Sequence, residues 1–233
     1  MEDVGLLEGN TGSGPGAIAP DGSAVDLYSL LPASGEPERI HAAIPAGGSI
    51  LELGAGAGRV TKGLLALGHE VVAVDESADM LSRIEGAETV CSPIQSLNLG
   101  RRFDGVLLLS YLIETADDRL RVDLLRACAR HVAPDGCVII QRQPPEWYDT
   151  VAPYERRVGE DRMVRMTDIH HPEPGRLAAT MEYTIGQHRW THSFVSQRLE
   201  DDYLTAVLAE AGLRPVGFID GDRGWVRAEP SAA

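Results

Sequence analysis

One short stretch of the chain has residue types and a spacing that suit ligand binding. Residues 50–60 read ILELGAGAGRV, where Glu52 precedes three glycines at alternate positions, Gly54, Gly56 and Gly58. Glycines allow the backbone to turn closely around a ligand because they adopt conformations that other residues rarely reach. A carboxylate at Glu52 favours a ligand that carries positive charge over one that carries phosphates. The stretch therefore predicts a binding turn for a positively charged ligand.

The spacing departs from the dinucleotide fingerprint. In G-x-G-x-x-G the third glycine lets a helix pack closely on the preceding strand, and the pyrophosphate lies on the helix N-terminus. Counted from Gly54, that third glycine would fall at residue 59, which is Arg59. An NAD-dependent oxidoreductase is therefore the less favoured interpretation.

A second acidic position indicates that the ligand contains a nucleoside. Asp75 ends the next apolar run, 21 residues beyond Gly54. An acid at this place accepts hydrogen bonds from both ribose hydroxyls, which dinucleotides and other nucleoside ligands share. Glu76 beside it would repel a 2′-phosphate, so NADP is the least favoured nucleotide.

The elements that carry these residues alternate between strands and helices. Near-continuous apolar runs predict strands at 49–53, 69–75, 87–92, 103–110 and 137–143, and helical spacing predicts helices at 58–68, 77–84 and 117–132. Two closing strands are expected at 213–220 and 224–229 after a helix near 200–212. Such a chain folds as α/β, with a doubly wound, Rossmann-like sheet of seven strands.

The pattern changes after residue 143. Residues 161–171, 176–185 and 188–199 predict three strands without helices between them, the last two joined by a tight hairpin at Gly186. We therefore expect one domain over 25–233, with 150–199 as a small antiparallel β insertion between strands 5 and 6 of the main sheet. Residues 8–23 are rich in Gly, Pro and Ser, so residues 1–24 are expected to form a flexible leader.

Several motifs in the right order resemble those of the class I S-adenosylmethionine-dependent methyltransferases. Residues 50–81 look like motifs I and II of that family, and the stretches RRFDGVLLLSYLIE and RHVAPDGCVII look like its fourth- and fifth-strand motifs. The likeness covers roughly residues 48–142, and residues 204–218 match the usual last helix and sixth strand. The resemblance implies S-adenosylmethionine as cofactor, with S-adenosylhomocysteine as product.

Carried over by position, the family's cofactor contacts fall on a defined set of residues. Gly54, Ala55, Gly56 and Gly58 would wrap the methionine part, with Glu52 near its amino group, Asp75 on the ribose, Glu76 and Met80 beside the adenine, and Ser110 and Tyr111 at the methionine end. An N-terminal tyrosine often reaches the cofactor carboxylate in related enzymes, and here either Tyr28 or Val25 takes that place. The chain has Pro93 where the family has an adenine-binding Asp, so Ser92, Gln95 or groups around Ile94 are expected to substitute.

The inserted layer is similar to that of small-molecule methyltransferases that N,N-dimethylate antibiotic amino sugars. This likeness implies a small metabolite as acceptor, methylated on N or O in a natural-product pathway, and a layer that can serve as lid and homodimer surface. A rival hypothesis keeps the fold and the cofactor in a protein that transfers no methyl group, such as a cyclase or a binding module.

Candidate bases cluster in the insertion. Four of the seven histidines lie there, and His188, Trp190 and His192 share one face of a strand. If that face borders the cleft, His192 and His171 are candidate bases, with Tyr111 as a third candidate catalytic group. The alternative is that the histidines are solvated on the outer face. Of Glu182 and Tyr183, only one can point inward.

The composition of the chain indicates which classes of partner it is expected to lack. The formal net charge of −14 disfavours a nucleic-acid substrate. The three cysteines do not have metal-ligand spacing, so we expect them to be reduced and buried in the core. No signal peptide is visible, and no apolar run approaches the roughly 20 residues that cross a bilayer. We expect a cytoplasmic protein without a membrane or metal partner.

Overall fold

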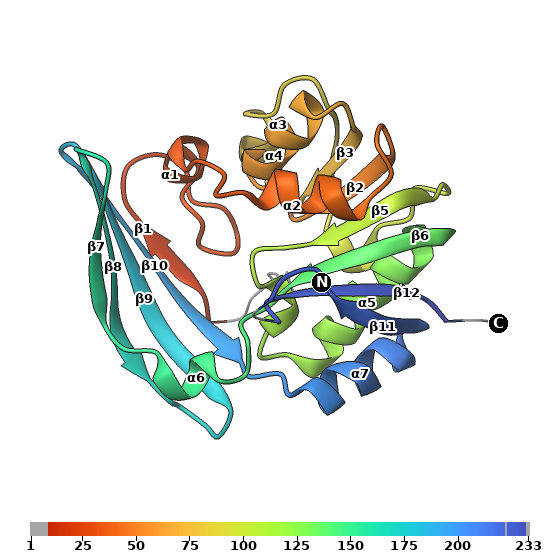
Figure 1. Cartoon of the computed structure of the whole chain (residues 1–233). Helices are drawn as coiled ribbons and strands as arrows, with labels where there is room; N and C mark the ends of the chain where they lie inside the picture. The colour runs from red at the N-terminus through yellow and green to blue at the C-terminus, as the bar shows by residue number, and fades with distance from the viewer. Residues whose placement is uncertain (1–8, 222, 232–233) are drawn as a thin grey trace.

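The computed structural model describes residues 9–221 and 223–231, whose strands form two separate sheets (Figure 1). The larger sheet has seven strands in the order β11-β12-β6-β5-β2-β3-β4. Their bounds are β2 (Ser49–Leu53), β3 (Glu70–Asp75), β4 (Glu88–Cys91), β5 (Phe103–Leu108), β6 (Val132–Gln141), β11 (Leu213–Phe218) and β12 (Trp225–Pro230). The strands β2 to β6 are parallel, and β12 runs antiparallel to both β6 and β11. The predicted sheet of seven strands is confirmed.

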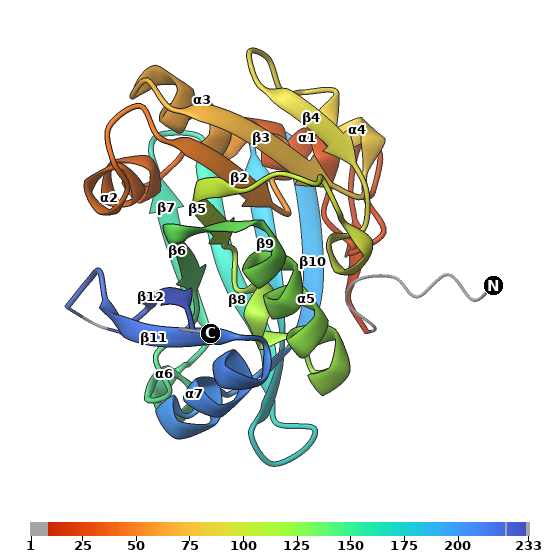
Figure 2. The same cartoon turned by 90° about the vertical axis from the view of Figure 1, so that its right-hand side faces the viewer.

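Helices cover both faces of this sheet because its strands are apolar on both sides. Along β6, Val138 and Ile140 pack in the core formed with α5 (Asp118–His131) and α7 (Asp201–Glu210). Ile139 packs in the opposite core with α2 (Glu36–Ala43) and α3 (Arg59–Ala66). Figures 1 and 2 show these two pairs of helices on opposite sides of the strands. The doubly wound arrangement follows directly from this alternation.

Local sequence signals set the helix ends. Asp117 caps α5 through its Oδ1, which accepts hydrogen bonds from the amides of Arg119 and Leu120. Ser77 caps α4 (Ala78–Leu81) through its hydroxyl, which accepts the Met80 amide at 3.3 Å. The short helices α1 (Val25–Leu30), η1 (Ile94–Ser96), η2 (Leu112–Glu114) and α6 (Trp147–Thr150) occupy connections. The helix α2 was not predicted, and it buries only Pro37 and Ile40.

The second sheet is antiparallel, with the order β1-β10-β9-β8-β7. Its strands are β1 (Thr11–Ser13), β7 (Tyr154–Val158), β8 (Arg162–His170), β9 (Arg176–Ile185) and β10 (His188–Gln197). The three expected strands are present, inserted after β6 as predicted, and β9 pairs with β10 across a two-residue turn in which Gly186 has φ 58°. The strands β1 and β7 were not predicted. The second sheet thus has five strands where the sequence indicated three, and one of the two additional strands comes from the N-terminal segment.

The N-terminal segment differs from the expected flexible leader. Residues 9–24 lie against the second sheet, where β1 pairs with β10 and the Trp190 indole donates a hydrogen bond to the Pro15 carbonyl at 2.9 Å. A Cβ placed on Gly14 would lie 2.3 Å from an atom of the Trp190 ring, so only a glycine at this position lets the backbone pack so closely against the ring. This segment has regular structure because the open edge of β10 supplies backbone partners. Residues 1–8 lie outside the described residues.

The cysteines are free, and one of them departs from expectation. Cys128 and Cys137 are buried as predicted, whereas Cys91 is exposed at the end of the edge strand β4. An edge strand has neighbours on one side only, so an apolar run does not guarantee burial there.

Among the described residues no helix is long and apolar enough to cross a membrane.

Candidate functional site

The three glycines form the turn between β2 and α3, and all have positive φ. The angles are 71° at Gly54, 55° at Gly56 and 80° at Gly58. A Cβ on Gly54 would lie 2.5 Å from Leu112 Cδ1, whereas no described atom lies within 4 Å of a Cβ built on Gly56. The turn therefore needs glycine for its backbone, and at Gly56 it faces open space.

Asp75 joins this turn to the end of β3. Its Oδ2 accepts the Gly56 amide at 2.8 Å, and its Oδ1 accepts the Ser77 amide at 2.9 Å. Burial raises the pKa of Asp75, and the two amide donors oppose that rise. Each carboxylate oxygen has a second lone pair, so Asp75 can still accept hydrogen bonds from a ligand.

Glu52 is a buried carboxylate at the base of the turn. Its side chain accepts a hydrogen bond from Thr61 Oγ1 at 2.6 Å, and the residue is 3% exposed. Burial raises its pKa to about 7, with Arg59 and Thr61 opposing the rise. A cation bound beside Glu52 would favour its charged form. The site therefore fits a ligand with a positive group at this end.

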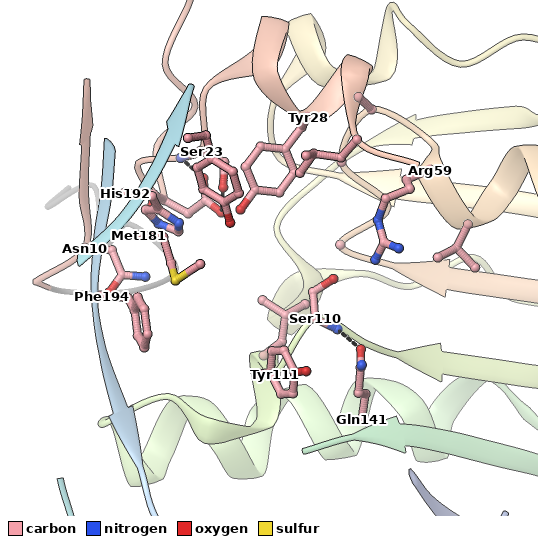
Figure 3. Close-up of a pocket in the computed structure, with 18 of the residues that line it drawn as sticks. Asn10, Ser23, Tyr28, Arg59, Ser110, Tyr111, Gln141, Met181, His192 and Phe194 are labelled. Atoms are coloured by element: carbon pink, nitrogen blue, oxygen red, sulfur yellow. Dashed lines mark hydrogen bonds between the residues drawn. The ribbon is translucent and has the colours of Figure 1, made fainter. Parts of the chain in front are cut away.

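These residues line one cavity of about 560 Å³ that lies between the two sheets. Its opposite wall is the inward face of the five-stranded sheet, where alternate residues point into the space. The inward residues of this wall are Tyr154, Arg156, Val158, Arg162, Val164, Met166, Met181, Tyr183, Ile185, His192, Phe194 and Ser196, and the lining also includes Met163 and Val195 of the same strands. Figure 3 shows His192, Met181 and Phe194 across the cavity from Arg59, Ser110 and Tyr111.

Most of the predicted cofactor contacts come together here. The cavity is lined by Tyr28, Glu52, Gly54, Ala55, Gly56, Asp75, Glu76, Met80, Ile94, Ser110 and Tyr111. Gly58 does not line it and instead begins α3 from a buried position. Val25, the alternative to Tyr28, is in the core against Met80.

The residues around Pro93 only partly meet the expectation for the adenine contact. Ile94 lines the cavity, but Ser92 does not, and its amide donates to the Asp75 carbonyl at 3.0 Å. Gln95 also lies outside the lining, although its Oε1 is buried without a hydrogen-bond partner among the described residues. Ile94 is thus the one predicted substitute that reaches the cavity.

The turn after β5 has an unusual backbone. Ser110 and Tyr111 both have positive φ, 53° and 63°, and the Ser110 amide donates to Gln141 Oε1 at 2.9 Å. Consecutive left-handed residues other than glycine are strained and cluster at functional sites. Tyr111 is 41% exposed. Enclosure by the cavity walls and nearby Glu114 raise its pKa to about 12, so its hydroxyl is a hydrogen-bond donor near neutral pH.

The histidines separate into two groups. His192 lines the cavity, and its Nε2 lies 3.2 Å from the Asp21 carbonyl oxygen. His171 is exposed in the β8–β9 connection, with its Nδ1 3.0 Å from the Arg176 carbonyl, and does not line the cavity. Of the two candidate bases, His171 therefore lies outside the cavity. His188, although on the same strand face as His192, is exposed at the start of β10.

Tyr183 is the inward member of its pair. It lines the cavity, whereas Glu182 lies on the outer face and forms ion pairs with Arg165 and Arg189. Arg165 also pairs with Glu155, so a charged ladder from Glu155 to Arg189 crosses the four strands β7 to β10 on the outer face. The outer face of the layer is therefore polar near its centre.

Sequence analysis missed several cavity residues. Asn10, Asp21 and Ser23 come from the segment that was expected to be flexible. Arg59 lines the cavity and forms an ion pair with Glu36 of α2. Glu114, at the end of η2, was overlooked although it follows the fifth strand of the structure at the same sheet edge as Asp75. Its position after a strand end was the available signal.

Two sequence comparisons identify the family. Residues 50–136 match the family model described as a methyltransferase domain. A cypemycin N-terminal methyltransferase from Streptomyces sp is 29% identical over 164 residues, which cover 63% of this chain and 67% of that protein. The chain is a class I S-adenosylmethionine-dependent methyltransferase. S-adenosylmethionine is its methyl donor.

Solved structures agree with this methyltransferase in fold. A methyltransferase from Clostridium acetobutylicum has a TM-score of 0.73 at 13% identity, covering 88% of this chain and 95% of that one. An amino pentose methyltransferase from Micromonospora echinaspora has a TM-score of 0.68 at 18% identity, covering 90% and 93%. A sugar N-methyltransferase from Streptoalloteichus sp also has a TM-score of 0.68, at 20% identity over 90% and 94%. The architecture is thus close to that of sugar N-methyltransferases.

The described part of this methyltransferase holds no group of three or more His, Cys, Asp or Glu side chains that could bind a metal ion.

Proposed function

We propose that the methyltransferase transfers a methyl group from S-adenosylmethionine to an N or O atom of a small-molecule acceptor, with nitrogen favoured. The main observation in support of this proposal is that one cavity extends from the Gly54–Gly58 turn to the inward face of the five-stranded sheet. One end has the features of a nucleoside and cation site, and the other has room and side chains for a second molecule.

In this proposal the glycine turn and the two acids hold the donor. Asp75 accepts the ribose hydroxyls, Glu52 lies beside the amino group, and Glu76, Met80 and Ile94 border the adenine. Ser110, Tyr111 and Tyr28 contact the methionine end. When bound, the donor supplies an electrophilic methyl group on a sulfonium sulfur, so the chain has to align the acceptor and exclude water.

The acceptor end suits an apolar body with a polar reacting atom. Met166, Met181, Tyr183 and Phe194 give the wall aromatic and thioether surface, while Arg156 and Arg162 add positive charge on the β7–β8 hairpin. Methionine side chains adapt to ligands of varied shape. His192 on the same wall is a candidate base, and Tyr111 is a candidate hydrogen-bond donor to the acceptor.

Nitrogen is favoured because the similar proteins are described as N-methyltransferases. They act, by their descriptions, on the N-terminus of cypemycin, on a sugar nitrogen and on a glycopeptide. All three are natural products or their parts, so we assign this chain to natural-product biosynthesis. We place it in the cytoplasm, where cysteines such as Cys91, Cys128 and Cys137 stay free. A homodimer through the inserted layer remains a prediction, and it would have to accommodate the charged ladder from Glu155 to Arg189.

Two measurements test the proposal. Isothermal titration should detect binding of S-adenosylmethionine, and S-adenosylhomocysteine release should be followed over a panel of amine, hydroxyl and carboxylate acceptors. Release with amines but not with carboxylates is expected. Tight donor binding without release from any acceptor in the panel would contradict methyl transfer to these atoms.

A further inference from the structure

We propose that the Glu114 carboxylate binds the acceptor amine as its ammonium ion and removes one proton from it before methyl transfer, an inference that rests on the proposed function. The acceptor would then be a primary or secondary amine on an apolar body.

The position of Glu114 places it beside the reacting groups. It is the last residue of η2, which directly follows the strained Ser110–Tyr111 turn at the end of β5. It lines the cavity although it is only 3% exposed. Since β2 and β5 are neighbouring parallel strands, their carboxyl ends meet at the same sheet edge, where ligands bind in this class of fold.

Two neutral donors hold the carboxylate in place, and a third residue supports one of them. One oxygen accepts the Gln143 amide, and the other accepts the Ser196 hydroxyl at 3.0 Å. The Tyr148 hydroxyl in turn hydrogen-bonds to the Ser196 hydroxyl. These partners come from the segment after β6, from β10 and from α6, so Glu114 connects the two sheets. Its orientation is thereby fixed toward the space between them.

The carboxylate has no directly paired cation. Within residues 9–221 and 223–231 it forms no ion pair with a lysine, arginine or histidine. Burial raises its pKa to about 7, opposed by the Gln143 amide, the two hydroxyls and the more distant Arg142. Tyr111 and Tyr148 are titratable groups near it, and both stay neutral near pH 7. The buried Arg121 guanidinium of α5 donates to the carbonyls of Ile113 and Thr115, on either side of Glu114. A proton acceptor is most effective when its pKa lies near the working pH.

An ammonium ion supplies the missing charge. Its N–H groups would donate to the remaining lone pairs of Glu114, and the aromatic surface of Trp147 and Phe194 in the same lining would favour a cation. One N–H proton moves to the carboxylate, which leaves a neutral amine with a free electron pair. That pair forms the new N–C bond while the C–S bond breaks and its electrons stay on sulfur. Glu114 then returns its proton to solvent after product release.

A charge-neutral substitution separates this role from a structural one. Glu114→Gln keeps the side-chain shape and an acceptor for Gln143 or Ser196, but it cannot take a proton. Glu88→Gln is the matched control, because Glu88 is exposed on β4, pairs with Arg101 and does not line the cavity. With an amine acceptor from the panel, Glu114→Gln should lower kcat by at least about tenfold and leave donor affinity within about twofold.

The pH profile gives a second readout. In the wild type, kcat/KM should rise with pH up to about 7, because Glu114 must be ionised to bind the ammonium ion, and then level off. Glu114→Gln should lose this rise, whereas Glu88→Gln should keep it. A variant that melts at lower temperature but keeps both kcat and the pH profile would assign Glu114 a structural role only.

A binding measurement tests the inference without turnover. The side-chain carboxyl of Glu114, identified by its absence in Glu114→Gln, is followed by carbon NMR during a pH titration of the full chain. Saturating 2-phenylethylamine should lower its midpoint by about one pH unit or more, and 2-phenylethanol, which is uncharged, should not. Failure of the amine to bind, or an unmoved midpoint, would overturn the inference. Absence of turnover with every acceptor would instead overturn the proposed function.

Discussion

Asp75 accepts a hydrogen bond from the Gly56 amide at 2.8 Å, so the end of β3 fixes the glycine turn that follows β2. The residue that we assign to the ribose therefore also shapes the turn that we assign to the methionine part of the donor. A mutation of Asp75 should therefore disturb both parts of the donor site at once.

We expect Asp75→Ala to weaken donor binding by roughly 1–3 kcal/mol, because charge-assisted hydrogen bonds and the anchor of the turn are lost together. Isothermal titration with S-adenosylmethionine measures the change, and circular dichroism checks that the variant is folded. An affinity equal to that of the wild type would mean that the ribose lies elsewhere.

Gly56→Ala tests whether the open space beside the turn belongs to the donor. Alanine at a φ of 55° is strained by roughly 1–2 kcal/mol. Gly100→Ala is matched, because Gly100 has φ 66°, no described atom near its Cβ and a place outside the cavity. Both variants should lose similar thermal stability, but only Gly56→Ala should lose donor affinity. Equal donor affinity in the two variants would show that Gly56 does not contact the donor.

Donor binding should release a proton through Glu52. Its pKa is about 7 in the free protein, and a bound cation favours the charged form, so binding lowers that pKa. Affinity should therefore rise between about pH 5 and pH 7 and change less above pH 7. Titrations in two buffers of different ionisation enthalpy measure the released proton. In Glu52→Gln the release should disappear, and persistence of the release there would assign it to another group.

The two buried carboxylates should also affect folding stability. Burial raises the pKa of both Glu52 and Glu114 to about 7, above the usual value near 4.5. Their contribution to stability is then present below about pH 4.5 and is lost as the pH rises through 7. The melting temperatures of Glu52→Gln and Glu114→Gln should fall less than that of the wild type between about pH 5 and pH 8. Parallel curves for wild type and variants would contradict the raised pKa values.

His192→Ala should lower turnover more than donor affinity if His192 acts as a base. His170→Ala is a suitable control, because His170 is exposed and does not line the cavity. Initial rates and donor titrations of both variants give the comparison. Normal turnover in His192→Ala would leave the hydrogen bond near Asp21 as the role of this side chain.

The sequence by itself determined the main sheet and most of the donor site. Apolar runs and helical spacing are local signals, and the carboxyl ends of parallel strands meet at one edge, so Gly54, Asp75 and Ser110 were predictable as neighbours. Alternation along a strand also predicted that His192 and Trp190 share a face. Each of these inferences needed only the chain's local periodicity and one topological rule.

Only the tertiary structure decided which residues complete the cavity. The pairing of β1 with β10 brings Asp21 and Ser23 to the site from residues that seemed too poor in apolar side chains to fold. The sheet register separates His192 from His171, and contacts across the two sheets bury Glu114 against Ser196. These outcomes depend on the partners that distant segments find in space, and no local pattern specifies those partners.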